Sequence, residues 1–258
     1  MRRAFLALAF ILGVMVSFLL FIFNGNNGVP VLMYHMVSDW SSRRALAVPV
    51  KEFDRQMLYL HQRGYQVMPL ETVLERLNCG KPLPRKTVVI TFDDGYQDNY
   101  LNALPVLKKY HFPATVFLPC NLVGEKNLWD IKRGKAEVRM LTREQIAEMM
   151  LNKISFQAHT SNHVVLTDVS PARARKEIYD SKKGLAGITG KNAEVFCYPS
   201  GRYNNQIKGY VKAAGFNYAF TTREGRIESG DDPYALKRIR VSGMSFFPDF
   251  ILRLELLR

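Results

Sequence analysis

The sequence predicts an α/β fold in which parallel strands form a (β/α) barrel, either complete or lacking a unit. Apolar runs of strand length alternate along the chain with amphipathic helical patterns, and this alternation is typical of parallel sheets with right-handed crossovers. About seven strand–helix units fit the chain, which favours one barrel over two small domains. The 258 residues are 47% hydrophobic and 23% charged, as in folded globular proteins. An open doubly wound sheet is the alternative arrangement.

The elements of the first half follow from the spacing of apolar residues. Two amphipathic stretches end at a glycine, Gly64 and Gly80, which is a common way for a helix to end. The run 88–91, rich in β-branched residues, predicts a buried strand. We expect strands at 29–37, 65–70, 88–91 and 114–120, and helices at 50–64, 70–80 and 99–110.

In the second half, two helix starts are marked by capping residues. Thr142 followed by Gln145 is a capping box, and Ser170 with Pro171 fits the N-cap and first position of a long helix. Residues 121–139 show no periodicity and predict a surface loop. We expect helices at 142–150, 170–190 and 204–214, and strands at 154–159, 194–199, 218–222 and 235–241.

The first residues carry a topological signal. Residues 4–23 contain no charge, and a helix of about 20 apolar residues spans the hydrocarbon core of a bilayer. Arg2 and Arg3 precede them, and such charges favour the cytoplasmic side. We therefore expect a single-pass membrane protein with a cytoplasmic N-terminus and an extracytoplasmic domain. Secretion after cleavage of a signal peptide is the alternative, although no A-x-A-like site follows. The expected organisation is a cytoplasmic stub and anchor at 1–24, a linker at 25–28, and one domain at 29–258.

The chain is strongly basic, with a net charge of +13. Such a field attracts anionic partners, including nucleic acid, phospholipid headgroups and acidic wall polymers, although scattered basic residues can also be merely solvated. Because no nucleic-acid motif, GxGxxG or P-loop is present, neither nucleic acid nor a nucleotide is expected as a partner. Three cysteines are too few for a disulfide framework.

Two adjacent carboxylates, Asp93 and Asp94, follow the predicted strand at 88–91. Each disfavours ionisation of the other, and a nearby divalent cation removes this cost. Two histidines four residues apart, His159 and His163, follow another predicted strand. Because parallel strands bring their carboxyl ends to one side of the fold, this set predicts a metal site with two His ligands and one Asp ligand. A turn at Asp–Gly and two unrelated histidines are the alternative.

These motifs resemble those of a known enzyme family. TFDDG at 91–95, HTSNH at 159–163 and FCYPSG at 196–201 are similar to successive motifs of the polysaccharide deacetylases, the NodB-homology enzymes of carbohydrate esterase family 4. The resemblance extends over roughly residues 29–241 and is strongest to the poly-β-1,6-N-acetylglucosamine deacetylase-like subgroup. It implies the distorted or incomplete (β/α) barrel of the NodB-homology type.

The resemblance also implies roles for individual residues. Asp94, His159 and His163 would bind a divalent metal, zinc above all, with cobalt, nickel or manganese as further candidates. Asp93 would act as general base on metal-activated water that attacks the acetamide carbonyl.

The third motif would complete the site. By the same resemblance, the backbone N–H of Ser200 would stabilise the oxyanion, and Tyr198 would lie in the substrate site. Typical members carry Arg and Tyr where this chain has Cys197 and Ser200. The arginine that steadies the base is therefore expected elsewhere, at Arg238 or Arg240.

The proton for the departing amine also needs a source. Many members supply it from a C-terminal Leu-x-His motif, but no histidine follows His163 in this chain. The similar subgroup is circularly permuted and carries the equivalent histidine in an N-terminal YH motif, which makes His35 the expected acid. A buried strand histidine with a satisfied ring is the alternative.

We therefore expect a membrane-anchored, metal-dependent hydrolase. It would remove N-acetyl groups from an N-acetylglucosamine-containing polysaccharide of the cell envelope or an exopolysaccharide. The alternatives are an O-deacetylase, a deacylase of a lipid-linked sugar, and a glycan-binding domain with weak or no turnover. Tyr34, Trp129 and Tyr203 could stack on sugar rings, although such residues are common in cores.

Overall fold

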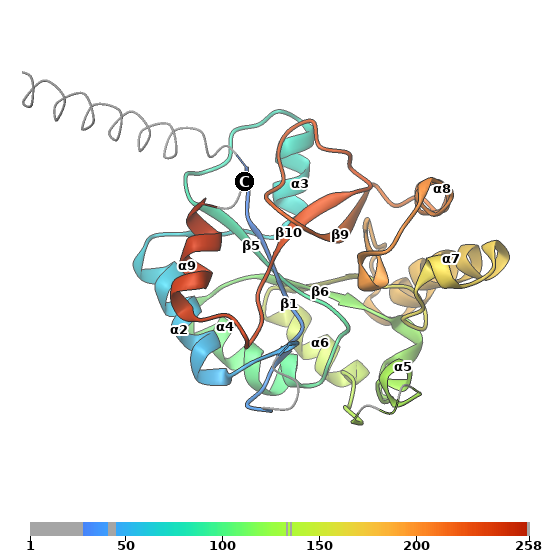
Figure 1. Ribbon diagram of the computed structural model, residues 1–258, viewed down its shortest axis with the longest axis horizontal. Helices are drawn as coiled ribbons and strands as arrows, with labels where there is room; N and C mark the ends of the chain where they lie inside the picture. Colours follow the sequence, from blue (N-terminus) through green and yellow to red (C-terminus); the bar gives the residue numbers. More distant parts are fainter. Residues whose placement is uncertain (1–27, 41–44, 133, 135, 257–258) are drawn as a thin grey trace, which may run out of the picture.

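The computed structural model, which describes residues 28–256 except 41–44, 133 and 135, contains a closed ring of parallel strands (Figure 1). The ring order is β1–β10–β9–β8–β7–β6–β5, and β5 pairs back onto β1. Every pairing in it is parallel. The ring strands are β1 (Val31–Tyr34), β5 (Thr87–Phe92), β6 (Ala114–Leu118), β7 (Ile154–Ala158), β8 (Val195–Cys197), β9 (Tyr218–Glu224) and β10 (Leu236–Arg240). The predicted barrel is thus confirmed, and the open doubly wound sheet is wrong.

The barrel is uneven around its circumference. β6 and β7 pair over five residues, whereas β7 and β8 pair only at Ala158 and Phe196. The pairing of β10 with β9 shifts register between Leu236 and Arg238. A short strand, β4 (Gln66–Val67), adds to the beginning of β5. Uneven pairing of this kind makes the barrel distorted rather than regular.

Residues along the strands alternate between an outer and an inner apolar layer. On β5, Val88, Ile90 and Phe92 belong to the cluster that packs against the helices, while Val89 belongs to a separate inner cluster. This two-residue period is what a pleated strand imposes when both of its faces are covered. The helices are α2 (Val50–Gln62), α3 (Leu70–Asn78), α4 (Leu104–Tyr110), α5 (Leu128–Ile131), α6 (Arg143–Leu151), α7 (Pro171–Thr189), α8 (Asn205–Ala213) and α9 (Phe247–Leu256).

The predicted helix caps are present. The Thr142 hydroxyl accepts a hydrogen bond from the backbone N–H of Gln145, whose side chain accepts in return from the N–H of Thr142. Ser170 caps α7 by accepting from the N–H of Arg173. Both helices therefore begin where the sequence indicates.

Four elements differ from the sequence-based expectations. The strand expected at 29–37 is divided at His35, because β2 (Met36–Val37) leaves the barrel to pair with β3 (Ala47–Val48). The helix expected at 99–110 begins with a π-helical turn, η2 (Asn99–Ala103). The C-terminal helix α9 was missed, and the loop expected at 121–139 contains α5.

The apolar stretch 4–23, predicted to be a membrane anchor, lies outside the described residues. Among the helices that the structure does describe, none combines the length and apolarity needed to cross a bilayer.

Candidate active site

The carboxyl ends of neighbouring barrel strands bring the sequence motifs together. Asp93 and Asp94 directly follow β5, and His159 directly follows β7. His163 lies in the tight turn that continues from His159. Asp93, Asp94 and His159 are buried. The expectation that these groups share one end of the barrel is therefore met by the geometry.

Asp94 faces both histidines. Its Oδ1 atom lies 3.3 Å from Nε2 of His159 and 3.0 Å from Nε2 of His163. One potential ligand atom from each of the three residues lies within 4.8 Å of the others. Two imidazole nitrogens and one carboxylate oxygen suit zinc and other first-row divalent ions, and three protein ligands leave positions open. The residues present therefore fit a catalytic metal.

The surroundings of Asp94 and His159 shift the pKa of each side chain. Burial by itself raises the pKa of Asp94, but the imidazoles of His163 and His159 outweigh it and hold the pKa well below its usual value. Burial lowers the pKa of His159, but contacts with Cys197 and Asp94 raise it well above normal. A proton on the His159 imidazole thus occupies the place that a cation would take.

The backbone at these ligands adopts unusual conformations. Asp94 has a φ of 74° and His163 a φ of 55°, in the left-handed region that side-chain-bearing residues rarely enter. Gly95 follows with a φ of 71°, and a Cβ there would meet Cδ1 of Leu118 at 2.4 Å. Such conformations cluster where a site must hold side chains in fixed directions.

Asp93 faces a different partner, Arg238 of β10. The two guanidinium nitrogens Nη1 and Nη2 donate to Oδ1 and Oδ2 of Asp93, both at 2.7 Å. Arg238 is fully buried and also donates to the hydroxyl of Thr91 and the carbonyl of Thr221. Burial raises the pKa of Asp93, but the bidentate contact with Arg238 more than compensates and lowers it. The carboxylate is therefore ionised and fixed in orientation.

We expected either Arg238 or Arg240 to steady the carboxylate of Asp93, and in the structure Arg238 contacts it. Arg240 instead donates from Nη2 to the carbonyl of Ala45, 3.2 Å away. Its guanidinium is therefore directed toward the loop before β3, and the prediction that it contacts the base is corrected.

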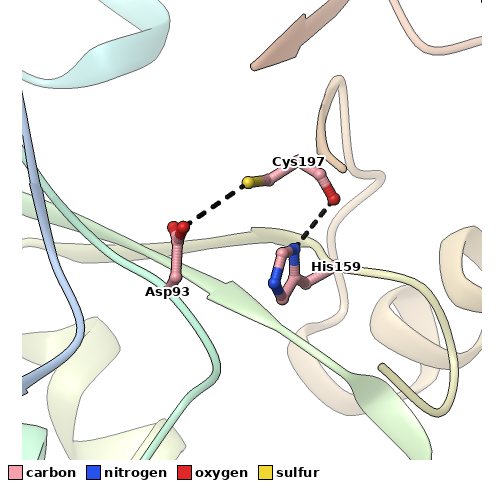
Figure 2. Close-up of side chains that lie close together, drawn as sticks. All are labelled: Asp93, His159 and Cys197. Carbon is pink, nitrogen blue, oxygen red and sulfur yellow. Dashed lines mark hydrogen bonds between the residues drawn. The ribbon is translucent and has the colours of Figure 1, made fainter. Parts of the chain in front are cut away.

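Cys197 contacts both Asp93 and His159 (Figure 2). Its Sγ atom is 3.7 Å from Oδ2 of Asp93, and its backbone carbonyl is 2.8 Å from Nδ1 of His159. The second contact occupies Nδ1 and leaves Nε2 of His159 directed at Asp94. Asp93, His159 and Cys197 could also group around a cation, but Arg238 donates to both Asp93 and the Cys197 sulfur. A positive charge already fills that position, which favours Asp94, His159 and His163 as the metal group.

His35 lies at the break between β1 and β2 and is half-buried. Burial lowers its pKa, while the charges of Asp94 and Asp93 raise it and those of Arg238 and Arg240 lower it. The structure thus places His35 within electrostatic reach of both aspartates.

The two residues of the third motif named as site candidates, Tyr198 and Ser200, differ in exposure. Ser200 is exposed in the short turn after β8 and has a φ of 58°. Tyr198 is fully buried, donates its hydroxyl to the carbonyl of Tyr234 and stacks on Tyr203. The Tyr198 side chain is therefore part of the core, and the prediction that it contacts substrate is corrected.

The other aromatic candidates differ in their placement. Tyr34 is fully buried, with its hydroxyl donating to Oε1 of Gln56 at 2.8 Å, so it cannot stack on a sugar. Trp129 of α5 stacks on the ring of His163, with centroids 4.1 Å apart. This contact with a candidate ligand was missed, because residues 121–139 show no periodic pattern that would place their side chains.

Thr91 was also missed as a partner of Arg238. Thr91 lies on β5 and Asp93 directly follows the strand, so in an extended chain these residues, two apart, point to the same face. That alternation was a signal available in the sequence.

Comparisons with known proteins agree with this geometry. A family model described as polysaccharide deacetylase matches residues 80–219. YxkH of Bacillus subtilis (strain 168) is 38% identical over 218 residues, 84% of this chain and 73% of that protein. The poly-β-1,6-N-acetyl-D-glucosamine N-deacetylase of Staphylococcus epidermidis is 32% identical over 78% of this chain and 70% of its own length.

Solved structures show the same fold. The Streptococcus pyogenes deacetylase PplD, in complex with acetate, superposes with a TM-score of 0.77 at 31% identity, covering 88% of this chain and 98% of that one. IcaB from Ammonifex degensii gives a TM-score of 0.77 at 29% identity, covering 89% and 97%.

Proposed function

The chain belongs to the polysaccharide deacetylases, and from this premise we propose that it is a metal-dependent N-deacetylase acting on an N-acetylglucosamine-containing polysaccharide. The observation that carries the proposal is that the neighbouring residues Asp93 and Asp94 contact different partners. Asp94 faces His159 and His163, while Asp93 forms its ion pair with Arg238. Metal binding alone would need only the first group. A separate, oriented carboxylate supports turnover rather than glycan binding.

Asp94, His159 and His163 would hold the cation. When bound, it would acidify a water molecule and polarise the acetyl carbonyl. Asp93 would accept the proton of the attacking water, because each carboxylate oxygen keeps a lone pair beyond the one that Arg238 uses. Its low pKa keeps Asp93 ionised but makes it a weak base, which suits a water that is already acidified.

Two further residues would complete the reaction. The backbone N–H of Ser200 would stabilise the developing oxyanion. His35 would donate a proton to the departing sugar amine, since an amide anion is a poor leaving group. We further propose that the domain works outside the cytoplasm, anchored by residues 4–23.

Poly-β-1,6-linked N-acetylglucosamine is the first substrate to test, because relatives at 29–32% identity are named for its N-deacetylation. The full chain, loaded with zinc, would be incubated with poly-β-1,6-linked, chitin and peptidoglycan oligomers, and released acetate and free amine would be quantified together. Cobalt, nickel and manganese would be compared. Acetate with an equal amount of new amine from at least one glycan is the expected result.

The decisive variant is Asp93→Asn, which should retain zinc but release no acetate. Asp54→Asn, at a surface aspartate paired with Lys109, is the matched control and should keep full activity. Acetate released only from O-acetylated sugars would replace N-deacetylation with O-deacetylation. A folded, zinc-loaded protein that releases no acetate from any of these substrates would refute the proposal.

A further inference from the structure

Within the described part of the chain, no strand pairs with one edge of the segment that carries His35. On its other edge, β2 pairs with β3: the N–H of Met36 donates to the carbonyl of Leu46, and the N–H of Ser38 donates to the carbonyl of Val48. In an extended chain, alternate residues direct their backbone groups to opposite edges. The backbone groups of His35 and Val37 therefore point away from β3.

Side chains take the place of the missing strand. Nδ2 of Asn99 donates to the carbonyl of His35 at 2.8 Å, and Nδ2 of Asn102 donates to the carbonyl of Val37 at 2.7 Å. The carboxyl of Asp98 accepts from the backbone of Val37 and, at 3.0 Å, from Nδ2 of Asn99. The carbonyls of His35 and Val37 and the N–H of Val37 are thereby satisfied at a place where water is largely excluded.

These three side chains are built into the fold. Asn99 is 1% exposed and Asp98 9%. Both Asn99 and Asn102 belong to the π-helical turn η2, and Asp98 directly precedes it. π-Helical turns are rare and are frequent at functional sites. The turn sits five residues after Asp94, so the motif that supplies base and ligand continues directly into it.

Asp98 has no role in the proposed chemistry, yet its carboxyl is buried. Burial raises its pKa to about 8, although bonds from Val37 and Asn99 act in the opposite direction. Near neutral pH the carboxyl is therefore largely protonated and acts as a neutral acceptor. An asparagine side chain would match its shape and accept the same bonds.

We propose that Asp98, Asn99 and Asn102 are positioning residues that fix the backbone of His35 relative to Asp93 and Asp94. On the barrel side, the carbonyl of Tyr34 accepts from the N–H of Asp93 at 2.9 Å. His35 is thus held from both directions by one continuous stretch of chain, residues 93–102. The inference rests on the proposed function, in which His35 supplies the proton to the leaving amine.

Asn99→Ala is the main test, because it removes the bond to His35. We expect kcat to fall by about 10- to 100-fold, as displaced catalytic groups do, with KM and zinc content unchanged. In a His35→Ala background the same substitution should have little further effect. Asn152→Ala is the matched control: it removes an amide-to-carbonyl bond of 2.8 Å, to Glu148, at the end of α6, and should leave kcat unchanged.

Three further variants keep the test decisive if Asn99→Ala fails to fold. Asn102→Ala should give a smaller fall in kcat of the same kind. Asp98→Asn should keep near-normal kcat, whereas Asp98→Ala should lower it. An equal fall in kcat for Asn99→Ala or Asn102→Ala with and without His35 would overturn the proposal.

A second readout does not depend on turnover. With 15N-labelled histidine, the imidazole signals of His35 should shift or broaden in Asn99→Ala or Asn102→Ala, while those of His61 and His111 stay unchanged. Unchanged His35 signals in both variants would overturn the positioning role. If the wild-type protein released no acetate, the proposed function would fail. The spectra would still decide whether Asn99 and Asn102 fix the position of His35.

Discussion

Asp93 and Asp94 are neighbours in the chain, but the two sides of the site neutralise them in different ways. Asp93 is paired with Arg238, whose guanidinium is permanently charged and fully buried. Asp94 lies against His159 and His163, and a cation can displace the proton of His159. The base side therefore carries its own counter-charge, while the ligand side depends on what is bound.

This difference explains how two adjacent carboxylates can both be ionised. Each points to a separate positive partner, so neither relies on the other's protonation. It also implies that loss of metal should disturb the ligand side and leave the Asp93–Arg238 pair intact. The following predictions test that separation.

Arg238→Met should have the largest effect, on both stability and activity. Removing one partner of a buried pair leaves an uncompensated charge, which costs about 3–5 kcal/mol. Denaturant unfolding would measure the loss, and acetate release should fall to background. The double variant Asp93→Asn/Arg238→Met should recover part of the stability but no activity. Equal stability of the single and double variants would contradict the pairing.

Asp94→Asn should abolish tight zinc binding and activity with a smaller loss of stability. Isothermal titration would measure affinity. In the wild-type protein, zinc affinity should fall as pH is lowered, because the raised pKa of His159 keeps a proton where the cation binds. The fall should approach about tenfold per pH unit for each proton displaced. A pH-independent affinity would argue against these ligands.

Cys197→Ala should have the smallest effect, and it should change the surroundings of Asp93 without changing zinc binding. It removes the sulfur contacts with Asp93 and Arg238 but keeps the backbone carbonyl that accepts from His159. We expect kcat to change by less than about tenfold, the effect of one weak contact, and zinc affinity to stay the same. A marked loss of zinc affinity would show that the two sides are not separate.

The sequence predicted the barrel and most of the grouped residues for a physical reason. Repeated strand–helix units enforce parallel strands, and parallel strands bring their carboxyl ends together, so residues placed after strands must converge. Asp93, Asp94, His159 and His163 all follow strands directly or within one turn. Their proximity could therefore be predicted without knowing the register of any strand.

The positions of other residues could not be predicted, because they depend on strand register and packing, which the sequence pattern does not show. Arg238 and Arg240 lie on the same face of β10, so the alternation of side chains along a strand could not distinguish them. The register shift between β10 and β9 also made their positions along the barrel unpredictable from the sequence. Tyr34 and Tyr198 resemble sugar platforms in sequence but lie in the core, because aromatic rings suit both environments. His35 lies at a break that arises only because β2 pairs outside the barrel.

The late position of Arg238 in the chain has a consequence for synthesis. Of the barrel strands that the structure describes, β10 comes latest in the chain; it is inserted between β1 and β9, so its docking both closes the ring and supplies the partner of Asp93. Until then, a nascent chain holds Asp93 without its counter-charge. The enzyme can therefore become competent only after β10 has been made, and fragments that end before residue 238 should be inert.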